Sequence, residues 1–229
     1  MRLDKFIANS TVFTRSRTKS IIRGGKIKVD GEVAKKAGQQ VNDDSVVEYM
    51  GVAISKAQPR YIMFNKPTGV VCANKDKDHA TVFDSLLVPR VETLHIAGRL
   101  DIDTTGLVLI TDDGQWLHQI TSPKHAHKKT YLVDLDAAIT DNQIRILSEG
   151  VQLKKEKTRS LPAEIEVINS QKIRMTISEG KYHQVKRMMA AVGNHVTKLH
   201  REQIAQIKLD AKLIEGQWRE LTKSEVDLG

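Results

Sequence analysis

AGRLDIDTTGLVLITDDG, at residues 97–114, joins a polar segment to a strongly apolar one. Its second part, GLVLIT at 106–111, is rich in branched aliphatic residues and has Gly and Asp at its ends, which predicts a buried β-strand. In the first part, Arg99, Asp101 and Asp103 occupy alternate positions. If the chain is extended there, these three side chains share one face. The segment therefore predicts a strand that follows a cluster of charged side chains.

Similar strand patterns occur on both sides of this segment. They are β-branched or alternate between apolar and polar residues, and turn-forming residues bound them. We expect strands over Arg60–Asn65, Gly69–Ala73, Gly106–Thr111, Lys129–Leu135, Ala163–Ile168 and Lys172–Ser178. We expect helices over Asp113–Ile120, Asp141–Ser148 and Tyr182–Val192. Because strands and helices do not alternate strictly, the pattern favours an α+β fold with an antiparallel-rich sheet over a doubly wound one.

The first forty residues differ from the rest of the chain in charge. They contain ten Lys or Arg and three acidic residues, a net charge of +7, whereas all 229 residues carry +8. This asymmetry indicates a polyanionic partner, because a basic surface that binds phosphates releases their counterions. A solubilising tail is the alternative. The side chains that we expect to contact the phosphates of such a partner are Arg2, Lys5, Arg15, Arg17, Lys19, Arg23, Lys26 and Lys28.

The basic segment also has the pattern of a folded module. Leu3, Phe6 and Ile7 have helical spacing, and Ser16 could cap a second helix. The run KIKVDGEVA, residues 26–34, alternates around an Asp-Gly pair, which is a signal for a two-residue hairpin. On the second helix, basic residues recur every four positions, so their charges share one face.

This N-terminal run resembles the S4 RNA-binding domain. The resemblance rests on RLDKFIA (residues 2–8), on SRTKSIIRGGKIKVDG (residues 16–31) and on their N-terminal position. It implies binding to structured RNA and says nothing about chemistry. We therefore expect a small S4-like α/β module over residues 1–45, a linker over 46–59 and a larger catalytic domain over 60–229.

The segment GRLDIDTTGL resembles the central motif of pseudouridine synthases, and the resemblance implies that Asp101 is the catalytic residue. Four further runs match motifs of the same enzymes. They are YIMFNKPTGVVC (61–72), TDDGQWLHQITSP (111–123), KKTYLV (128–133) and EGKYHQVKRMMAAVGNHV (179–196). The second of these is similar to the branch that modifies small-subunit ribosomal RNA. The resemblance thus implies isomerisation of a uridine to pseudouridine in small-subunit (16S) ribosomal RNA by a mixed-sheet catalytic domain of the pseudouridine synthase type.

The same resemblance implies supporting roles for other residues. Tyr131 would be an active-site aromatic residue that could stack on the extruded uracil. Lys186 would supply the positive charge beside Asp101, with Arg187 as the second candidate. Arg99 could fill the gap left by the flipped base or bind a phosphate. Structural roles stay open: a buried strand residue for Tyr131, an exposed helix face for the basic pair, and an Arg–Asp ion pair for Arg99.

The implied reaction breaks the C1′–N1 bond of uridine and rejoins the uracil through C5. Nothing is oxidised or lost, so we expect no cofactor and no metal, and one carboxylate suffices as nucleophile at C1′ or base at C2′. The eight histidines lack the spacing of a metal site, and the single cysteine, Cys72, excludes an internal disulfide. Without an apolar run of membrane-spanning length or a signal peptide, we expect a cytoplasmic monomer that contacts no membrane.

Two other functions are compatible with the sequence. One is a pseudouridine synthase that acts on large-subunit ribosomal RNA, because such enzymes share the GRLD motif. The other is a non-catalytic S4-type protein that binds RNA during ribosome assembly. The sequence leaves open the target uridine, the choice between free RNA and an assembling particle, and the chemical role of Asp101.

Overall fold

The computed structural model describes residues 1–88 and 90–228 and divides the chain into two compact units, Met1–Pro59 and Arg60–Gly229. The N-terminal unit contains two helices and an antiparallel sheet in the order β2-β1-β3-β4. Its elements are α1 (Leu3–Ser10), α2 (Arg15–Arg23), β1 (Ile27–Val29), β2 (Glu32–Val33), β3 (Val47–Tyr49) and β4 (Val52–Ala53). Apolar side chains from the helices and from β1 and β3 form a single core, in which Leu3, Ile7 and Ile27 are fully buried.

The local predictions for this unit are mostly confirmed. The expected hairpin is present, and Asp30 and Gly31 both have positive φ angles, 52° and 85°, as a tight two-residue turn requires. The expected helix cap is wrong by two residues. Thr14 caps α2 by accepting a hydrogen bond from the backbone N–H of Arg17 at 3.2 Å, so Ser16 lies within the helix. The segment expected as a linker contains β3 and β4, which complete the sheet.

The second unit is built on a nine-stranded mixed sheet. Seven strands follow the order β13-β5-β7-β11-β8-β10-β9, β6 pairs with β7, and β12 pairs with β11. Every pairing is antiparallel except that of β7 with β11. The strands are β5 (Tyr61–Lys66), β6 (His95–Ala97), β7 (Thr105–Thr111), β8 (Lys129–Leu135), β9 (Glu164–Asn169), β10 (Lys172–Ile177), β11 (Val196–Ile204), β12 (Ile207–Lys208) and β13 (Trp218–Glu220).

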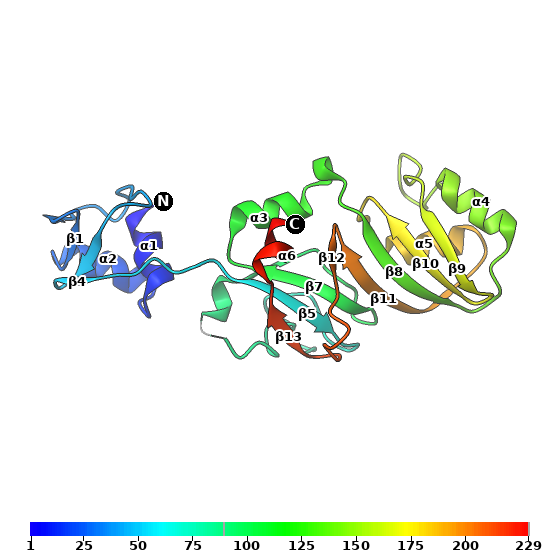
Figure 1. Ribbon diagram of the computed structural model, residues 1–229, viewed down its shortest axis with the longest axis horizontal. Coiled ribbons are helices and arrows are strands. Elements are labelled where there is room, and N and C mark those ends of the chain that lie inside the picture. The colour runs from blue at the N-terminus through cyan, green and yellow to red at the C-terminus, as the bar shows by residue number, and fades with distance from the viewer. Residues whose placement is uncertain (89, 229) are drawn as a thin grey trace. The chain divides into compact units, whose positions relative to one another are not determined.

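Helices pack beside both halves of this sheet. They are η1 (Val91–Thr93), α3 (Gly114–Thr121), η2 (Pro123–His125), α4 (Asp141–Glu149), α5 (Gln184–Ala191) and α6 (Lys223–Asp227). In Figure 1, α3 and α6 lie beside the half with β5 and β7, and α4 and α5 lie beside the half with β8, β9 and β10. Alternate residues of β7 belong to two different apolar clusters: Val108 and Ile110 to one, Leu107 and Leu109 to the other. Burial on both faces explains why GLVLIT is a continuous apolar run.

Five of the six predicted strands and all three predicted helices are present, with bounds shifted by at most two residues. The prediction for Gly69–Ala73 is wrong, because this stretch is a loop with one isolated bridge from Val71 to Thr81. Gly69 has a φ of 77°, and its N–H donates to the Ile102 carbonyl at 2.9 Å, so it leaves the strand conformation to support another loop.

None of the helices that the structure describes is long and apolar enough to cross a membrane. Within the same residues there is no group of three or more His, Cys, Asp or Glu side chains that could hold a metal ion.

Candidate active site

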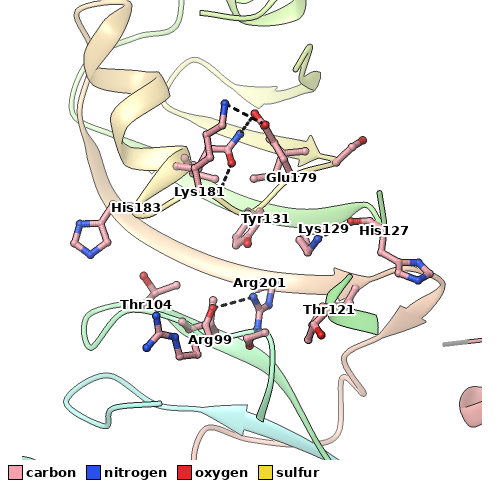
Figure 2. Close-up of a pocket in the computed structure, with 18 of the residues that line it drawn as sticks. Arg99, Thr104, Thr121, His127, Lys129, Tyr131, Glu179, Lys181, His183 and Arg201 are labelled. Carbon is pink, nitrogen blue, oxygen red and sulfur yellow. Dashed lines mark hydrogen bonds and ion pairs between the residues drawn. The ribbon is translucent and has the colours of Figure 1, made fainter. Parts of the chain in front are cut away.

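A cavity of about 410 Å³ opens against the central strands of the second unit. It is lined by residues of β8 and β11, by the loop that leads into β7, and by the start of α5. Figure 2 shows Tyr131, Lys129 and Arg201 in the middle of this space, with His183 on the left and His127 on the right. Its volume is within the range of cavities that bind small ligands.

Asp101 lies on a tight loop at the edge of this cavity, and hydrogen bonds from Lys66 stabilise that loop. The Lys66 ammonium is fully buried and donates to the carbonyls of Pro67 at 2.8 Å, Ile102 at 3.3 Å and Thr104 at 2.8 Å. Burial lowers the pKa of Lys66. Its three donors are thus all used by backbone carbonyls, which join Lys66 to both ends of the Ile102–Thr104 segment.

Arg201 holds the other side of the same loop. Its side chain, from the centre of β11, is only 2% exposed. The guanidinium donates from Nε to the Leu107 carbonyl at 2.8 Å, from Nη2 to the Gly98 carbonyl at 2.8 Å and from Nη1 to the Arg99 carbonyl at 3.3 Å; Figure 2 shows the contact with Arg99. A rigid planar donor suits this task because it can fix several acceptors at once.

Two basic side chains contact the carboxylate of Asp101, whose side chain is 28% exposed. Lys186 Nζ lies 3.2 Å from Oδ2, and His183 Nε2 lies 3.2 Å from Oδ1. Lys186 also donates to Asp103 Oδ1 at 2.6 Å. Burial alone would lower the pKa of Lys186, but its hydrogen bonds to Asp103 and Asp101 raise it. The hydrogen bond from Lys186 lowers the pKa of Asp103.

The turn before α5 brings both bases to the carboxylate. His183 has a φ of 48° at the N-cap of α5, a left-handed conformation that is uncommon for a residue with a side chain. Gln184 stabilises this turn by accepting from the Lys181 N–H at 2.8 Å and donating to Glu179 Oε1 at 2.6 Å. Lys186 then follows three positions after His183, near the same face of the first helical turn.

Tyr131 and Lys129 form the floor of the cavity on β8. Tyr131 is 8% exposed and is paired in register with Arg201. The Lys129 ammonium donates to the His127 carbonyl at 2.8 Å. Burial lowers the pKa of Lys129, and the positive charge of Arg201 lowers it further. Tyr131 is thus both a buried strand residue and a cavity-lining aromatic residue.

Two expected supporting residues are not at the carboxylate. Arg187 points elsewhere, donating to Glu156 Oε1 at 2.9 Å and to the Tyr182 carbonyl at 3.0 Å, so of the two candidates Lys186 is the one that contacts Asp101. Arg99 lines the cavity with an exposed side chain. Within residues 1–88 and 90–228 it forms no ion pair, so the Arg–Asp pair that we considered is not formed.

The eight basic side chains expected to bind RNA are all exposed on the N-terminal unit. Arg2 is partly neutralised, because it donates to both carboxylate oxygens of Asp4 at 2.8 and 3.0 Å. That hydrogen-bonded pair lowers the pKa of Asp4. In the part of the chain that the structure describes, none of the other seven forms an ion pair.

Sequence reasoning missed three residues that shape the site: His183, Lys66 and Arg201. His183 and Lys66 fall inside motifs that the resemblance had already marked, but His183 was considered only as a metal ligand. Arg201 lies in TKLHREQ, a charged stretch that gave no strand signal. Arg201 could have been identified as a buried charge only if residues 196–204 had first been recognised as a strand.

This arrangement pairs one carboxylate with two basic groups, beside a cavity that contains an aromatic ring. Glu179 also lines the cavity, but it pairs with Lys181 at 3.2 Å. Residues 60–191 match the model of the RNA pseudouridylate synthase family, and residues 1–47 match that of the S4 domain. The chain therefore belongs to the RNA pseudouridylate synthase family and is an isomerase that acts on RNA.

Individual relatives resemble it over their whole length. It is 52% identical over 227 residues to ribosomal small subunit pseudouridine synthase A of Escherichia coli, covering 99% of this chain and 98% of that protein. It is 50% identical over 229 residues to the protein of the same name from Vibrio parahaemolyticus, with the same coverage. A crystal structure of a pseudouridylate synthase, 44% identical, matches with a TM-score of 0.73 over 100% of this chain and 99% of that one. The predicted family, fold class and enzyme class are confirmed.

Proposed function

We propose that this enzyme isomerises a uridine of small-subunit ribosomal RNA to pseudouridine and that Asp101 is its catalytic carboxylate. The observation that carries the proposal is the position of Asp101 at the cavity, in contact with Lys186 and His183. The names of relatives that are 46–52% identical over nearly the full chain support the small-subunit target.

The site residues divide the work of this reaction. A uridine that enters the cavity must leave its stack, at a cost of about a few kcal/mol in paired RNA. Tyr131 would receive the uracil by stacking. Lys186 places a positive charge 3.2 Å from Oδ2 of the carboxylate that acts in both chemical schemes, by attack on C1′ or by removal of the C2′ proton. Lys66 and Arg201 act through the backbone and position the Asp101 loop.

The test is the Asp101→Asn variant of the full chain, assayed on small-subunit and large-subunit ribosomal RNA with chemical mapping of pseudouridine. We expect the wild type to modify the small-subunit RNA, and the variant to bind it but form no product. Asp136→Asn, at an exposed position of the same unit that does not line the cavity, is the matched control and should keep the activity. Product formation by Asp101→Asn would overturn the catalytic assignment, and modification of large-subunit RNA alone would overturn the target.

We propose further that the exposed cations of the N-terminal unit bind phosphates of the same RNA and that the enzyme acts as a monomer. A monomer is supported by the site itself, to which one chain contributes Asp101, Lys186, His183 and Arg201. A ribosomal substrate also supports a cytoplasmic location. Assays on free RNA and on partly assembled small subunits would distinguish the two forms of substrate.

A further inference from the structure

Tyr182 presents an aromatic ring to solvent beside the active site. Tyr182 is 74% exposed. One face of the ring stacks on His183, with centroids 3.7 Å apart and an interplanar angle of 20°. An aromatic ring in this position has lost little water-accessible area by stacking, so packing alone does not account for it.

His183 lies between the Asp101 carboxylate and the exposed Tyr182 ring. His183 Nε2 contacts Asp101 Oδ1 at 3.2 Å, and Tyr182 covers the His183 ring. A third ring on Tyr182 would therefore lie next to the nucleotide whose sugar is at Asp101. Unpaired RNA bases supply such rings, and they stack on aromatic side chains without regard to sequence.

A second cavity, of about 820 Å³, adjoins this stack. Tyr182, Arg187, Lys154 and Lys155 are among the residues that line it. Its one acid, Glu156, already pairs with Arg187 at 2.9 Å. The ammonium groups of Lys154 and Lys155 are exposed and have no acidic partner among residues 1–88 and 90–228. An aromatic face beside unneutralised cations is the combination that binds single-stranded nucleic acid.

We propose that this cavity binds the nucleotide adjacent to the target uridine in an unpaired strand, with its base on Tyr182 and its phosphate against Lys154 and Lys155. The inference rests on the proposed function, because it takes Asp101 as the place of the target nucleotide. It adds a requirement that the proposed function lacks: the RNA on one side of the target must be single-stranded.

Kinetics on a small-subunit ribosomal RNA fragment test the stack. Tyr182→Ala should raise the KM about 5- to 150-fold, the value of one base–aromatic stack, with kcat at saturating RNA unchanged. Tyr182→Phe keeps the ring and should behave like the wild type. Val167→Ala, at another exposed position of the same unit, is the surface control. An unchanged KM in Tyr182→Ala, or an equal loss in Tyr182→Phe, would overturn the proposal; a fall in kcat alone would show that Tyr182 acts only through His183.

The two lysines have a separate readout. The double variant Lys154→Gln, Lys155→Gln should reduce the slope of log affinity against log salt by about 0.7, the contribution of one neutralised phosphate in a single strand. An unchanged slope would remove the phosphate from the proposal.

Ultraviolet cross-linking distinguishes failure of this inference from failure of the proposed function. The Asp101→Asn protein is bound to the same RNA fragment, irradiated and mapped. We expect a cross-link from Tyr182 to a nucleotide next to the target, and none in Tyr182→Ala. If Asp101→Asn is inactive and Tyr182 forms no cross-link, the proposed function stands and the stack is wrong. If Asp101→Asn still forms pseudouridine, the proposed function fails, whatever Tyr182 contacts.

Discussion

Lys186 stands between two carboxylates, and only one of them lines the cavity. Its ammonium is closer to Asp103, at 2.6 Å, than to Asp101, at 3.2 Å, yet the Asp103 side chain is 66% exposed and that of Asp101 is 28% exposed. Solvent screens the first contact more than the second. Asp103 therefore helps to position the Lys186 ammonium, and the charge of Lys186 acts mainly on Asp101.

The first prediction concerns this lysine. Lys186→Met should lower kcat about 10- to 100-fold, because a partly buried carboxylate loses its charged hydrogen-bond partner at about 1–3 kcal/mol. Lys186→Arg should restore most of the activity, since it keeps the charge. Single-turnover assays on small-subunit ribosomal RNA, under saturating enzyme, measure the effect. Equal activity of the Met and Arg variants would show that charge at this position does not matter.

At the scale of elements, the parallel contact of β7 with β11 permits no side chain at Gly106. A Cβ atom there would lie 2.4 Å from the Arg201 carbonyl oxygen, and Gly106 has a φ of 105°. Gly106→Ala should lower the free energy of unfolding by about 3 kcal/mol or more through overpacking and backbone strain. Gly114→Ala, where a Cβ meets nothing within 4 Å, is the control and should be neutral or slightly stabilising. Urea unfolding of both variants measures the difference, and equal midpoints would contradict it.

The short helix α6 depends on one ionised acid. Glu225 accepts from both Nη groups of Arg219 at 2.7 and 2.8 Å and completes a capping box with Thr222. The Arg219 hydrogen bonds lower the pKa of Glu225 from 4.5 to about 2. Its contribution to stability is therefore complete above pH 4.5 and is lost as the pH falls towards about 2.

Glu225→Gln should accordingly lower the free energy of unfolding by about 1.5 kcal/mol at pH 7. This difference from the wild type should shrink between pH 4.5 and 2 as the native carboxylate is protonated. Denaturation curves over this pH range provide the measurement. Glu215→Gln, an exposed position without hydrogen bonds in the described chain, should show neither effect. A difference that stays constant down to pH 2 would rule out this titration.

The elements also show where sequence reasoning succeeds. Strands β5, β7, β8, β9 and β10 could be predicted because their apolar runs reflect burial. Helix α3, which contains Trp116, could be predicted because Asp113 caps it. The central strand β11 could not. In its sequence, VTKLHREQI, the buried position 201 is an arginine. Arg201 binds the active-site loop, and it replaces the apolar residue that would have completed an alternating strand pattern.

The site divides in the same way. Asp101, Tyr131 and Lys186 each lie in a short contiguous motif, so the resemblance was enough to propose them as site residues. The contact of His183 with Asp101 depends on a left-handed residue before α5. That conformation is a consequence of tertiary packing, which local sequence does not encode.

At the scale of the whole molecule, the residues expected to bind RNA phosphates and the residues expected to carry out the reaction belong to different units. Nearly all its net positive charge is in the first forty residues, whereas its carboxylate and cavity lie in the second unit. On α2, Arg15, Lys19 and Arg23 form an exposed row at four-residue spacing. If this row follows a phosphate backbone, its loss should weaken RNA binding without changing the reaction step.

Replacing Arg15, Lys19 and Arg23 together by Gln in the full chain should therefore reduce the salt slope of RNA affinity by about two to three, at about 0.9 for each duplex phosphate contact. The single-turnover rate at saturating enzyme should stay at the wild-type value, because these residues belong to the other unit than Asp101. A triple variant that exchanges Arg and Lys at the same positions keeps the charge and should keep the slope, which separates electrostatic attraction from a bidentate contact. A slope that does not change in the Gln variant would mean that the row does not contact phosphate and that other surfaces supply the affinity.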